Sequence, residues 1–488
     1  MNSNMLIIQS PAIWPMIEYE YDIIRREIKQ SSRVITLIKC DSNRFFCPAG
    51  NSYKGPEIRH CTECMSKFQH FYEILVSEEK GINLINKKRS IRGSENIEWL
   101  LNQLPESVKD KAVQSARSTY MTQKRDPAPD INDDKKFYNR LVLEFIDNYN
   151  FIKTLPLNID KIYLFNGRLV NYRPYLLHFK ELMPKVYEYP WFDHERYIVN
   201  EGYYPHDLIK FSLDIYAKFS LSEFRHLKYK LHIGSSWFES RLKNINVDAT
   251  GAFHKNSNED FLEDKETNYF VFFTSSEDEM GGIDEFFQNS IYESQLLAIK
   301  NIYESLPKNT KLIVRIHPRL KGVQNVYEKR LISYCFNSDI ILFKADSKIN
   351  SYYLAKISKC VISFGSTIGA ESAYLEKISI VLSPAPYQCF NIAFFPKNHY
   401  ELIVLLNKCA NNTIVKIENV KENACKYAYA LMTYGIKTKY AKKTKYESGY
   451  VLANNKYIKI RSSLFIHLYN IIIDGLQRRL KNVYKLHK

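Results

Sequence analysis

The chain has 488 residues, which is enough for two or three domains at roughly 100–200 residues each. Hydrophobic residues make up 45% and charged residues 25%, which excludes a collagen-like or largely disordered chain. The formal net charge is +16, but it is unevenly placed. From Lys416 to Lys488 there are 16 Lys/Arg and 4 Asp/Glu, so this segment carries +12 and the first 415 residues only +4.

The first 22 residues lack the basic region and the long apolar region of a signal peptide. No window approaches the roughly 18 apolar residues that a membrane-spanning helix needs. Nine cysteines are too sparse for a disulfide scaffold. We therefore expect a cytoplasmic protein, attached at most peripherally to the inner face of the plasma membrane.

The first half of the chain begins as a βαβ unit and then becomes mostly helical and polar. The apolar run Leu6–Gln9, a helix over Ile17–Lys29 and a strand over Arg33–Lys39 form that start. A second strand, Asp160–Phe165, ends in Asn166-Gly167-Arg168, and a helix is expected from Pro174 because proline suits a first helical turn. This half predicts a decorated α/β domain over residues 1–261.

From residue 262 to 415 short apolar strands alternate with helices of about ten residues. The predicted strands are Tyr269–Thr274, Lys311–Ile316, Asp339–Phe343, Cys360–Phe364 and Ile378–Leu382. The predicted helices are Ile291–Leu306, Val326–Phe336, Ile349–Ser358 and a segment ending near Leu375. This alternation is typical of a parallel sheet with helices on both faces, so we predict a second, doubly wound domain.

Polar segments follow three of these strands. They are Thr274-Ser275-Ser276, His317-Pro318-Arg319 and Gly365-Ser366-Thr367. Doubly wound sheets bind ligands at the carboxyl ends of their strands, and hydroxyls before a helix suit phosphate. We therefore predict an anionic ligand there, with Glu371 accepting from ribose hydroxyls. The alternatives are a simple N-cap at Ser366 or Thr367 and a favourable helix-dipole position for Glu371.

Together, these segments resemble a known group of enzymes. The series FFTSSEDE, LIVRIHPRL and CVISFGSTIGAESAYLEKISIVL is similar to the C-terminal half of GT-B glycosyltransferases that build bacterial surface polysaccharide. It is most similar to the group with an HP motif and a serine motif, which includes capsule Kdo-transferases, polysialyltransferases and CDP-glycerol glycerophosphotransferases. The resemblance implies that His317, Pro318, Ser366 and Thr367 bind the donor nucleotide's phosphates, and that two Rossmann-type domains face a cleft.

Candidate residues in the first half are fewer. Arg168 follows a strand and is predicted to reach substrate, either an acidic acceptor or the donor phosphate, unless the segment is an ordinary turn. Glu201 and Asp207 lie in an aromatic-rich segment and are the candidate catalytic bases. No Asp-x-Asp follows a strand, and Asp278 and Asp133-Asp134 are interpreted as helix-start or solvated charges. The chemistry is therefore predicted to be independent of metal.

Four cysteines, Cys40, Cys47, Cys61 and Cys64, lie within 25 residues, the last two as a CxxC pair. A structural zinc site needs four such ligands, and CxxC can supply one knuckle of it. The spacing of the first pair is wider than usual, so unpaired thiols in a reducing compartment are the alternative.

The C-terminal segment 416–488 is predicted to be a basic helical extension. Residues 462–485 place apolar side chains at helical spacing and end in Arg478, Arg479, Lys481 and Lys485. Such a helix can lie on an anionic membrane or pack back on the protein.

The sequence as a whole predicts a metal-independent glycosyltransferase that moves a sugar from a nucleotide-activated donor to a surface polysaccharide or lipid-linked acceptor. The alternatives are a CDP-alcohol-dependent polyol-phosphate transferase, a zinc-containing nucleic-acid-binding protein, and a non-catalytic capsule assembly subunit. The nearly neutral first 415 residues argue against nucleic acid as a partner.

Overall fold

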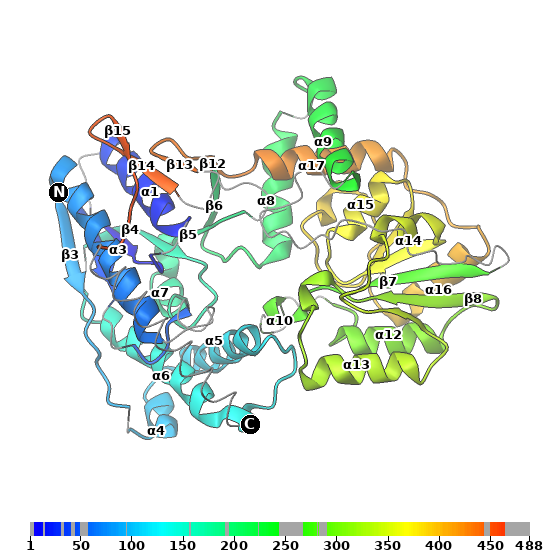
Figure 1. Ribbon diagram of the computed structural model, residues 1–488, viewed down its shortest axis with the longest axis horizontal. Coiled ribbons are helices and arrows are strands. Elements are labelled where there is room, and N and C mark those ends of the chain that lie inside the picture. Colours follow the sequence, from blue (N-terminus) through cyan, green and yellow to red (C-terminus); the bar gives the residue numbers. More distant parts are fainter. Residues whose placement is uncertain are drawn as a thin grey trace, which may run out of the picture.

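A computed structural model of the chain shows two lobes side by side (Figure 1). It describes residues 4–12, 15–30, 34–40, 44–48, 57–93, 95–155, 158–190, 195–222, 224–243, 267–280, 282, 290–443 and 449–463. We call the lobe built on the first sheet the first lobe and the lobe built on the second sheet the second lobe.

The first lobe contains a seven-stranded sheet of order β12-β6-β5-β4-β1-β2-β3. Its strands are β1 (Asn4–Ile8), β2 (Val34–Lys39), β3 (Ile82–Asn86), β4 (Ile159–Phe165), β5 (Lys185–Glu188), β6 (Arg196–Glu201) and β12 (Ile436–Lys437). The five strands from β3 to β5 are parallel, whereas β6 and β12 are antiparallel to their neighbours.

The second lobe contains a five-stranded, wholly parallel sheet of order β11-β10-β7-β8-β9. Its strands are β7 (Asn268–Phe273), β8 (Thr310–Arg315), β9 (Ile341–Phe343), β10 (Cys360–Ser363) and β11 (Ile378–Val381). Each begins and ends within two residues of its predicted bounds. β10 is buried along its whole length and β7 at every position but the first, as expected for strands covered on both faces.

Helices surround both sheets. In the first lobe they are α1 (Met16–Gln30), α3 (Glu57–Glu78), α4 (Ile97–Asn102), α5 (Glu106–Lys124), α6 (Lys135–Ile152) and α7 (Arg173–His178). The next two, α8 (Leu208–Ser220) and α9 (Leu227–Leu242), pack on the helix Val420–Thr433. Those that follow are α10 (Glu277–Met280), α12 (Gln295–Glu304), α13 (Val326–Phe336), α14 (Ser351–Ile357), α15 (Ile368–Tyr374), α16 (His399–Ala410) and α17 (Val420–Thr433).

Both parallel cores have the strand order of a Rossmann-type unit, in which the third, second, first, fourth and fifth strands lie side by side. The predicted fold class, an α/β protein with two such units, is confirmed. In each sheet the order reverses beside the first strand, at β1/β4 and at β7/β10, and this is where such folds bind ligands.

The C-terminal segment differs from the helical extension expected. After α17, the chain returns to the first lobe, where β12 pairs with β6 and a small sheet of β13 (Ala441–Lys443), β14 (Gly449–Ala453) and β15 (Lys456–Ile458) lies beside α1. Asp22 on α1 accepts from the backbone N–H groups of Lys439 (2.6 Å) and Tyr440 (2.5 Å). Of the expected helical extension, residues 420–433 are helical as α17, whereas β12 to β15 pair as strands. Most of the predicted amphipathic helix, from residue 464 on, lies outside the described residues.

Helix α9 packs very closely against α17. A Cβ atom added at Gly234 on α9 would lie 2.0 Å from the backbone oxygen of Cys425, a distance that no packed structure tolerates. The glycine is therefore required by the close approach of the two helices.

We expect Gly234→Ala to destabilise the protein by about 1–3 kcal/mol, because the clash outweighs the better helix propensity of alanine. Urea unfolding monitored by circular dichroism measures the change. Ser236→Ala, on the same helix, is the control and should leave the midpoint nearly unchanged. A Gly234→Ala protein at least as stable as the parent would refute this packing.

Candidate functional site

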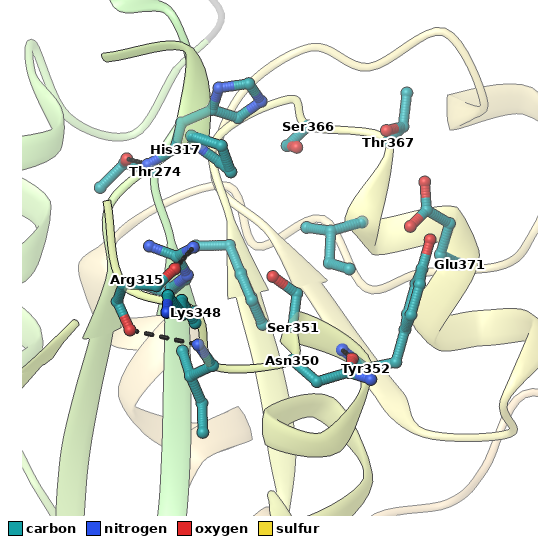
Figure 2. A pocket seen from close by; sticks show the side chains of 15 residues that line it. Thr274, Arg315, His317, Lys348, Asn350, Ser351, Tyr352, Ser366, Thr367 and Glu371 are labelled. Atoms are coloured by element: carbon teal, nitrogen blue, oxygen red, sulfur yellow. Dashed lines mark hydrogen bonds between the residues drawn. The ribbon is translucent and has the colours of Figure 1, made fainter. Parts of the chain in front are cut away.

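A pocket of about 720 Å³, open to solvent, lies at the carboxyl ends of the second sheet (Figure 2). It is lined by residues that end or follow four strands and begin two helices. These residues are Phe273, Thr274, Arg315, His317, Pro318, Ser347, Lys348, Ile349, Asn350, Ser351, Tyr352, Ser366, Thr367, Ile368 and Glu371. Four of the eight predicted substrate-binding residues, His317, Ser366, Thr367 and Glu371, are therefore brought together in one pocket.

His317 is held by hydrogen bonds at both its backbone and its ring. Its backbone N–H donates to Thr274 Oγ1 (2.8 Å), and its Nδ1 accepts from the backbone N–H of Arg319 (3.2 Å). Since Nδ1 is the acceptor, this hydrogen bond assigns the proton of the neutral ring to Nε2. The ring therefore carries an N–H donor at the pocket.

Ser366 and Thr367 follow β10 through Gly365, whose φ of +70° makes the tight turn. Thr367 occupies the N-cap position of α15 but makes no side-chain capping hydrogen bond, so its hydroxyl is not used as a cap. The Tyr387 hydroxyl donates to the Ser366 carbonyl (2.7 Å) and holds the turn in place. Both hydroxyl side chains line the pocket.

Arg315 is buried, and its guanidinium is used to hold the loop after β9. Nη1 donates to the carbonyls of Ile316 (3.0 Å) and Lys344, and Nη2 to that of Ser347 (3.0 Å). This loop brings Lys348 to the pocket, and α14 begins there with Asn350 as its N-cap. Sequence reasoning missed Lys348, although the same strand-end rule, applied to β9, identifies its segment.

Glu371 lies at the pocket edge but is already paired. Its Oε1 accepts from Arg241 Nε (3.0 Å) and Nη2 (2.8 Å), and both side chains are about 95% buried. This bidentate pair links α15 to α9. The expected contact of Glu371 with ribose stays a prediction. The ion pair with Arg241 shows that Glu371 also has a structural role.

Three other predicted residues lie outside the pocket-lining set. Ser275 Oγ donates to the Phe364 carbonyl (2.9 Å), so it ties β7 to the turn after β10. Ser276 accepts a backbone hydrogen bond from Glu279 (3.3 Å) at the start of α10. Arg319 accepts, through its carbonyl, a bond from Arg125 of the first lobe.

A second group of ionisable side chains gathers where the two lobes meet. Arg168, after β4, is only 6% exposed; its Nη1 donates to Ser118 Oγ (2.7 Å) and Thr122 Oγ1 (3.0 Å) of α5. Thr122 Oγ1 also donates to the Asp278 carbonyl (3.3 Å), which brings α10 of the second lobe against α5. Among the described residues Arg168 makes no ion pair, and its Nε has no hydrogen-bond partner. An unpaired buried guanidinium is costly, which indicates a ligand.

Glu188, at the end of β5, is the carboxylate of this group whose properties best suit a general base. Its Oε2 accepts from Asn166 Nδ2 (2.9 Å) and its Oε1 from the N–H of Tyr189 (3.2 Å). Burial raises the pKa of Glu188 to about 7, opposed by the Asn166 hydrogen bond and by Arg168. A carboxylate that titrates near neutrality is suited to general base catalysis.

The pKa values of two other members of the group are also shifted. Burial, helped by Glu279, raises the pKa of Asp278 to about 6, and Asp278 lies in the first turn of α10, where a helix-start charge was expected. Burial and the nearby Arg168 lower the pKa of His206 to about 3, and its buried Nδ1 has no hydrogen-bond partner among the described residues. Perturbed groups of this kind mark functional sites.

The two bases proposed from the sequence have other contacts. Asp207 is the N-cap of α8 and accepts from the N–H of Lys210 (3.2 Å). Glu201 is exposed and pairs with Lys185 (2.7 Å), whose hydrogen bond lowers the pKa of Glu201. A lowered pKa makes a carboxylate a weaker base, so Glu188 fits that role better.

The four clustered cysteines form no disulfide and are partly buried. Cys61 and Cys64 both lie on α3, and the Cys64 sulfur accepts from the N–H of Ala12 (3.2 Å). A helix places the pair one turn apart rather than in a metal knuckle, and within the described part of the chain no three His, Cys, Asp or Glu form a metal-binding group. Zinc at Cys40, Cys47, Cys61 and Cys64 stays a prediction that these residues support poorly.

None of the helices that the structure describes is long and apolar enough to cross a bilayer.

Comparisons with known proteins reach only the level of the fold. No family model matches the chain, and no curated protein matches it in sequence. The chain is similar in structure to the β-Kdo 2,7 transferase of Thermosulfurimonas dismutans KpsC, with 14% identity, 64% of this chain and 85% of that chain covered, and a TM-score of 0.34. The β-Kdo 2,4 transferase of the same KpsC gives 12% identity, 65% and 88% coverage and a TM-score of 0.37.

A third similar structure is a putative UDP-N-acetylglucosamine 2-epimerase from Listeria monocytogenes, with 9% identity, 90% of this chain and 93% of that chain covered, and a TM-score of 0.27. Identities and TM-scores this low carry no argument about activity or substrate. The chain thus has a distant structural similarity to Kdo transferases and nucleotide-sugar enzymes of two Rossmann-type units.

Proposed function

We propose that the protein is a glycosyltransferase that moves a sugar from a nucleotide-activated donor to a surface glycan or lipid-linked acceptor. The observation that supports this most is the pocket at the carboxyl ends of β7, β8 and β10, because it gathers neutral donors and two cations, Arg315 and Lys348. His317, Ser366 and Thr367 offer N–H and O–H groups, and Lys348 offers positive charge. That set suits a diphosphate or monophosphate linked to a nucleoside.

In the proposed reaction the second group acts on the acceptor. The Glu188 carboxylate takes the proton of the acceptor hydroxyl, and the hydroxyl oxygen forms a bond to the anomeric carbon of the sugar. The bond between that carbon and the phosphate oxygen breaks, and the nucleotide leaves with the electron pair. Lys348 and the donors around it stabilise the charge that develops on the leaving phosphate, a role that fixed dipoles and cations perform well.

Asn166 is proposed to position Glu188, since its amide donates to one carboxylate oxygen. Arg168, buried and without an ion pair among the described residues, is proposed to contact the substrate. A single displacement of this kind inverts the anomeric configuration, which proton NMR of the product reports directly.

Nucleotide binding tests the proposal. Isothermal titration of the full chain with UDP, CMP, CDP and GDP should show one of them binding, and Lys348→Ala should weaken that binding about tenfold or more, because a hydrogen bond to a charged group is lost. Lys321→Ala is the matched control, since Lys321 is exposed outside the pocket. Failure of every nucleotide to bind would overturn the proposal.

The alternative of a CDP-alcohol-dependent polyol-phosphate transferase uses the same pocket and breaks a phosphoanhydride bond instead. Its product contains phosphodiesters, which ³¹P NMR detects and which a glycosyl transfer does not create. Tight binding of CDP with a phosphodiester product would favour this second activity.

A further inference from the structure

Helices α8 and α9 and the connection between them form a hairpin, of which α9 stands out at the upper edge of the molecule, beside α17 (Figure 1). We call residues 221–222 and 224–229, from the connection and the start of α9, the hairpin tip. One side of the hairpin packs on α17 and on the turn at Gln388–Phe390. The tip projects beyond these contacts.

Hydrogen bonds hold the described residues of the tip together. Buried Lys230 donates to the carbonyl and the Oγ (3.1 Å) of Ser222, and the Arg225 N–H closes a turn onto the Ser222 carbonyl (3.1 Å). At its base, the Phe219 ring lies 6.0 Å from that of Phe390. The side chains of the tip are therefore presented on a rigid support.

Large apolar side chains on the tip are exposed together. Leu221 is 88% exposed, Phe224 83% and Tyr229 61%. Single exposed apolar residues are ordinary on protein surfaces, but three within nine residues at a projecting end are not. Such a group is expected to have an apolar partner.

Basic residues surround this apolar group. Lys218, Arg225 and Lys228 are exposed, and residues 208–243 contain 7 Lys/Arg against 3 Asp/Glu in sequence. Apolar and aromatic side chains together with basic ones fit the boundary of an anionic bilayer, where the chains enter the acyl region and the cations contact headgroups.

We propose that the hairpin tip docks the protein on an anionic lipid surface, with Leu221 and Phe224 inserted and Arg225 and Lys228 at the headgroups. This proposal does not depend on the proposed reaction.

Co-sedimentation of the full chain with vesicles tests this, with mixed phosphatidylglycerol and phosphatidylcholine compared against phosphatidylcholine alone. The chain should bind the anionic vesicles, and the double variant Leu221→Ser/Phe224→Ser should lower the partition coefficient about tenfold or more, since two side chains lose their burial. Arg225→Gln/Lys228→Gln should lower it for anionic vesicles and reduce its dependence on salt.

The matched control is Phe336→Ser, which removes a 65% exposed phenylalanine from α13, on the opposite edge of the molecule (Figure 1). It should bind vesicles like the parent, and all variants should keep the parent's melting temperature. Equal vesicle binding by Leu221→Ser/Phe224→Ser and parent would overturn the proposal. So would a parent that binds no vesicles, or whose tip instead forms a dimer that the double variant abolishes.

Discussion

Glu188→Gln is expected to lower the rate of sugar transfer by about 10²- to 10⁴-fold, while nucleotide binding at the pocket stays unchanged. Glutamine keeps the shape of the side chain and can still contact Asn166 and the Tyr189 N–H, but it cannot accept a proton. Initial rates with the donor that binds, together with titration of that donor, separate the two effects.

The dependence of the parent's rate on pH gives an independent check of the same assignment. Because the pKa of Glu188 is raised to about 7, the base is protonated and inactive below this pH and becomes active above it. The rate should therefore rise with pH through about 7, and Glu188→Gln should abolish this rise in the residual rate.

Glu201→Gln is the matched control, because Glu201 belongs to the adjacent strand of the same sheet but is exposed and paired with Lys185. It should keep nearly all activity. Normal turnover by Glu188→Gln with a normal pH profile would remove Glu188 from the mechanism while leaving the nucleotide pocket untouched. Loss of nucleotide binding in Glu188→Gln would indicate a structural role instead.

Arg241→Met is expected to destabilise the protein by about 3–5 kcal/mol, because it leaves the Glu371 carboxylate buried without its partner. The two residues form a bidentate pair at 2.8 and 3.0 Å between α9 and α15. Denaturant unfolding of parent and variant measures the loss. The double variant Arg241→Met/Glu371→Leu should recover much of it, since neither charge then remains buried.

A surface pair on the same helix is the control. Lys243 and Glu239 lie 3.8 Å apart and are both exposed, so Lys243→Ala should cost less than about 1 kcal/mol. Equal and small losses in Arg241→Met and Lys243→Ala would show that the buried pair contributes little. Because Glu371 lines the pocket, the double variant also tests whether its carboxylate contributes to nucleotide binding.

Much of the second lobe was predictable because its signals are local. The runs YFVFF and CVI are apolar at every position, as a strand covered on both faces requires, and they lie in β7 and β10. The rule that ligands bind at carboxyl ends of such strands then indicated His317, Ser366 and Thr367, which share one pocket. It did not indicate Lys348, because this residue lies five positions beyond the end of β9 at Phe343 rather than directly at a strand end.

The first lobe was harder to predict because its site depends on neighbours distant in sequence. Arg168 donates a hydrogen bond to α5, about fifty residues earlier in the chain, and α5 in turn donates one to α10, about a hundred residues after Arg168. The pKa of Glu188 is raised by burial in that assembly, and no pattern around the sequence KVYEYP contains this information. The CxxC pair is ambiguous in the sequence, since its spacing is the same in a zinc knuckle and in the helix α3 where it lies.

The sequence by itself determined the two alternating α/β patterns, the strand-end polar segments and the concentration of charge in the last 73 residues. Apolar periodicity depends on neighbouring positions and residue counts depend on composition, so both can be recognised without knowing the fold. Only the tertiary structure decided that the chain after α17 returns as strands beside β6 and α1, and that Glu188, Arg168 and Asp278 meet between the lobes. Strand pairing, desolvation and charge–charge interaction depend on distance in space, and the order of strands in the two sheets sets that distance.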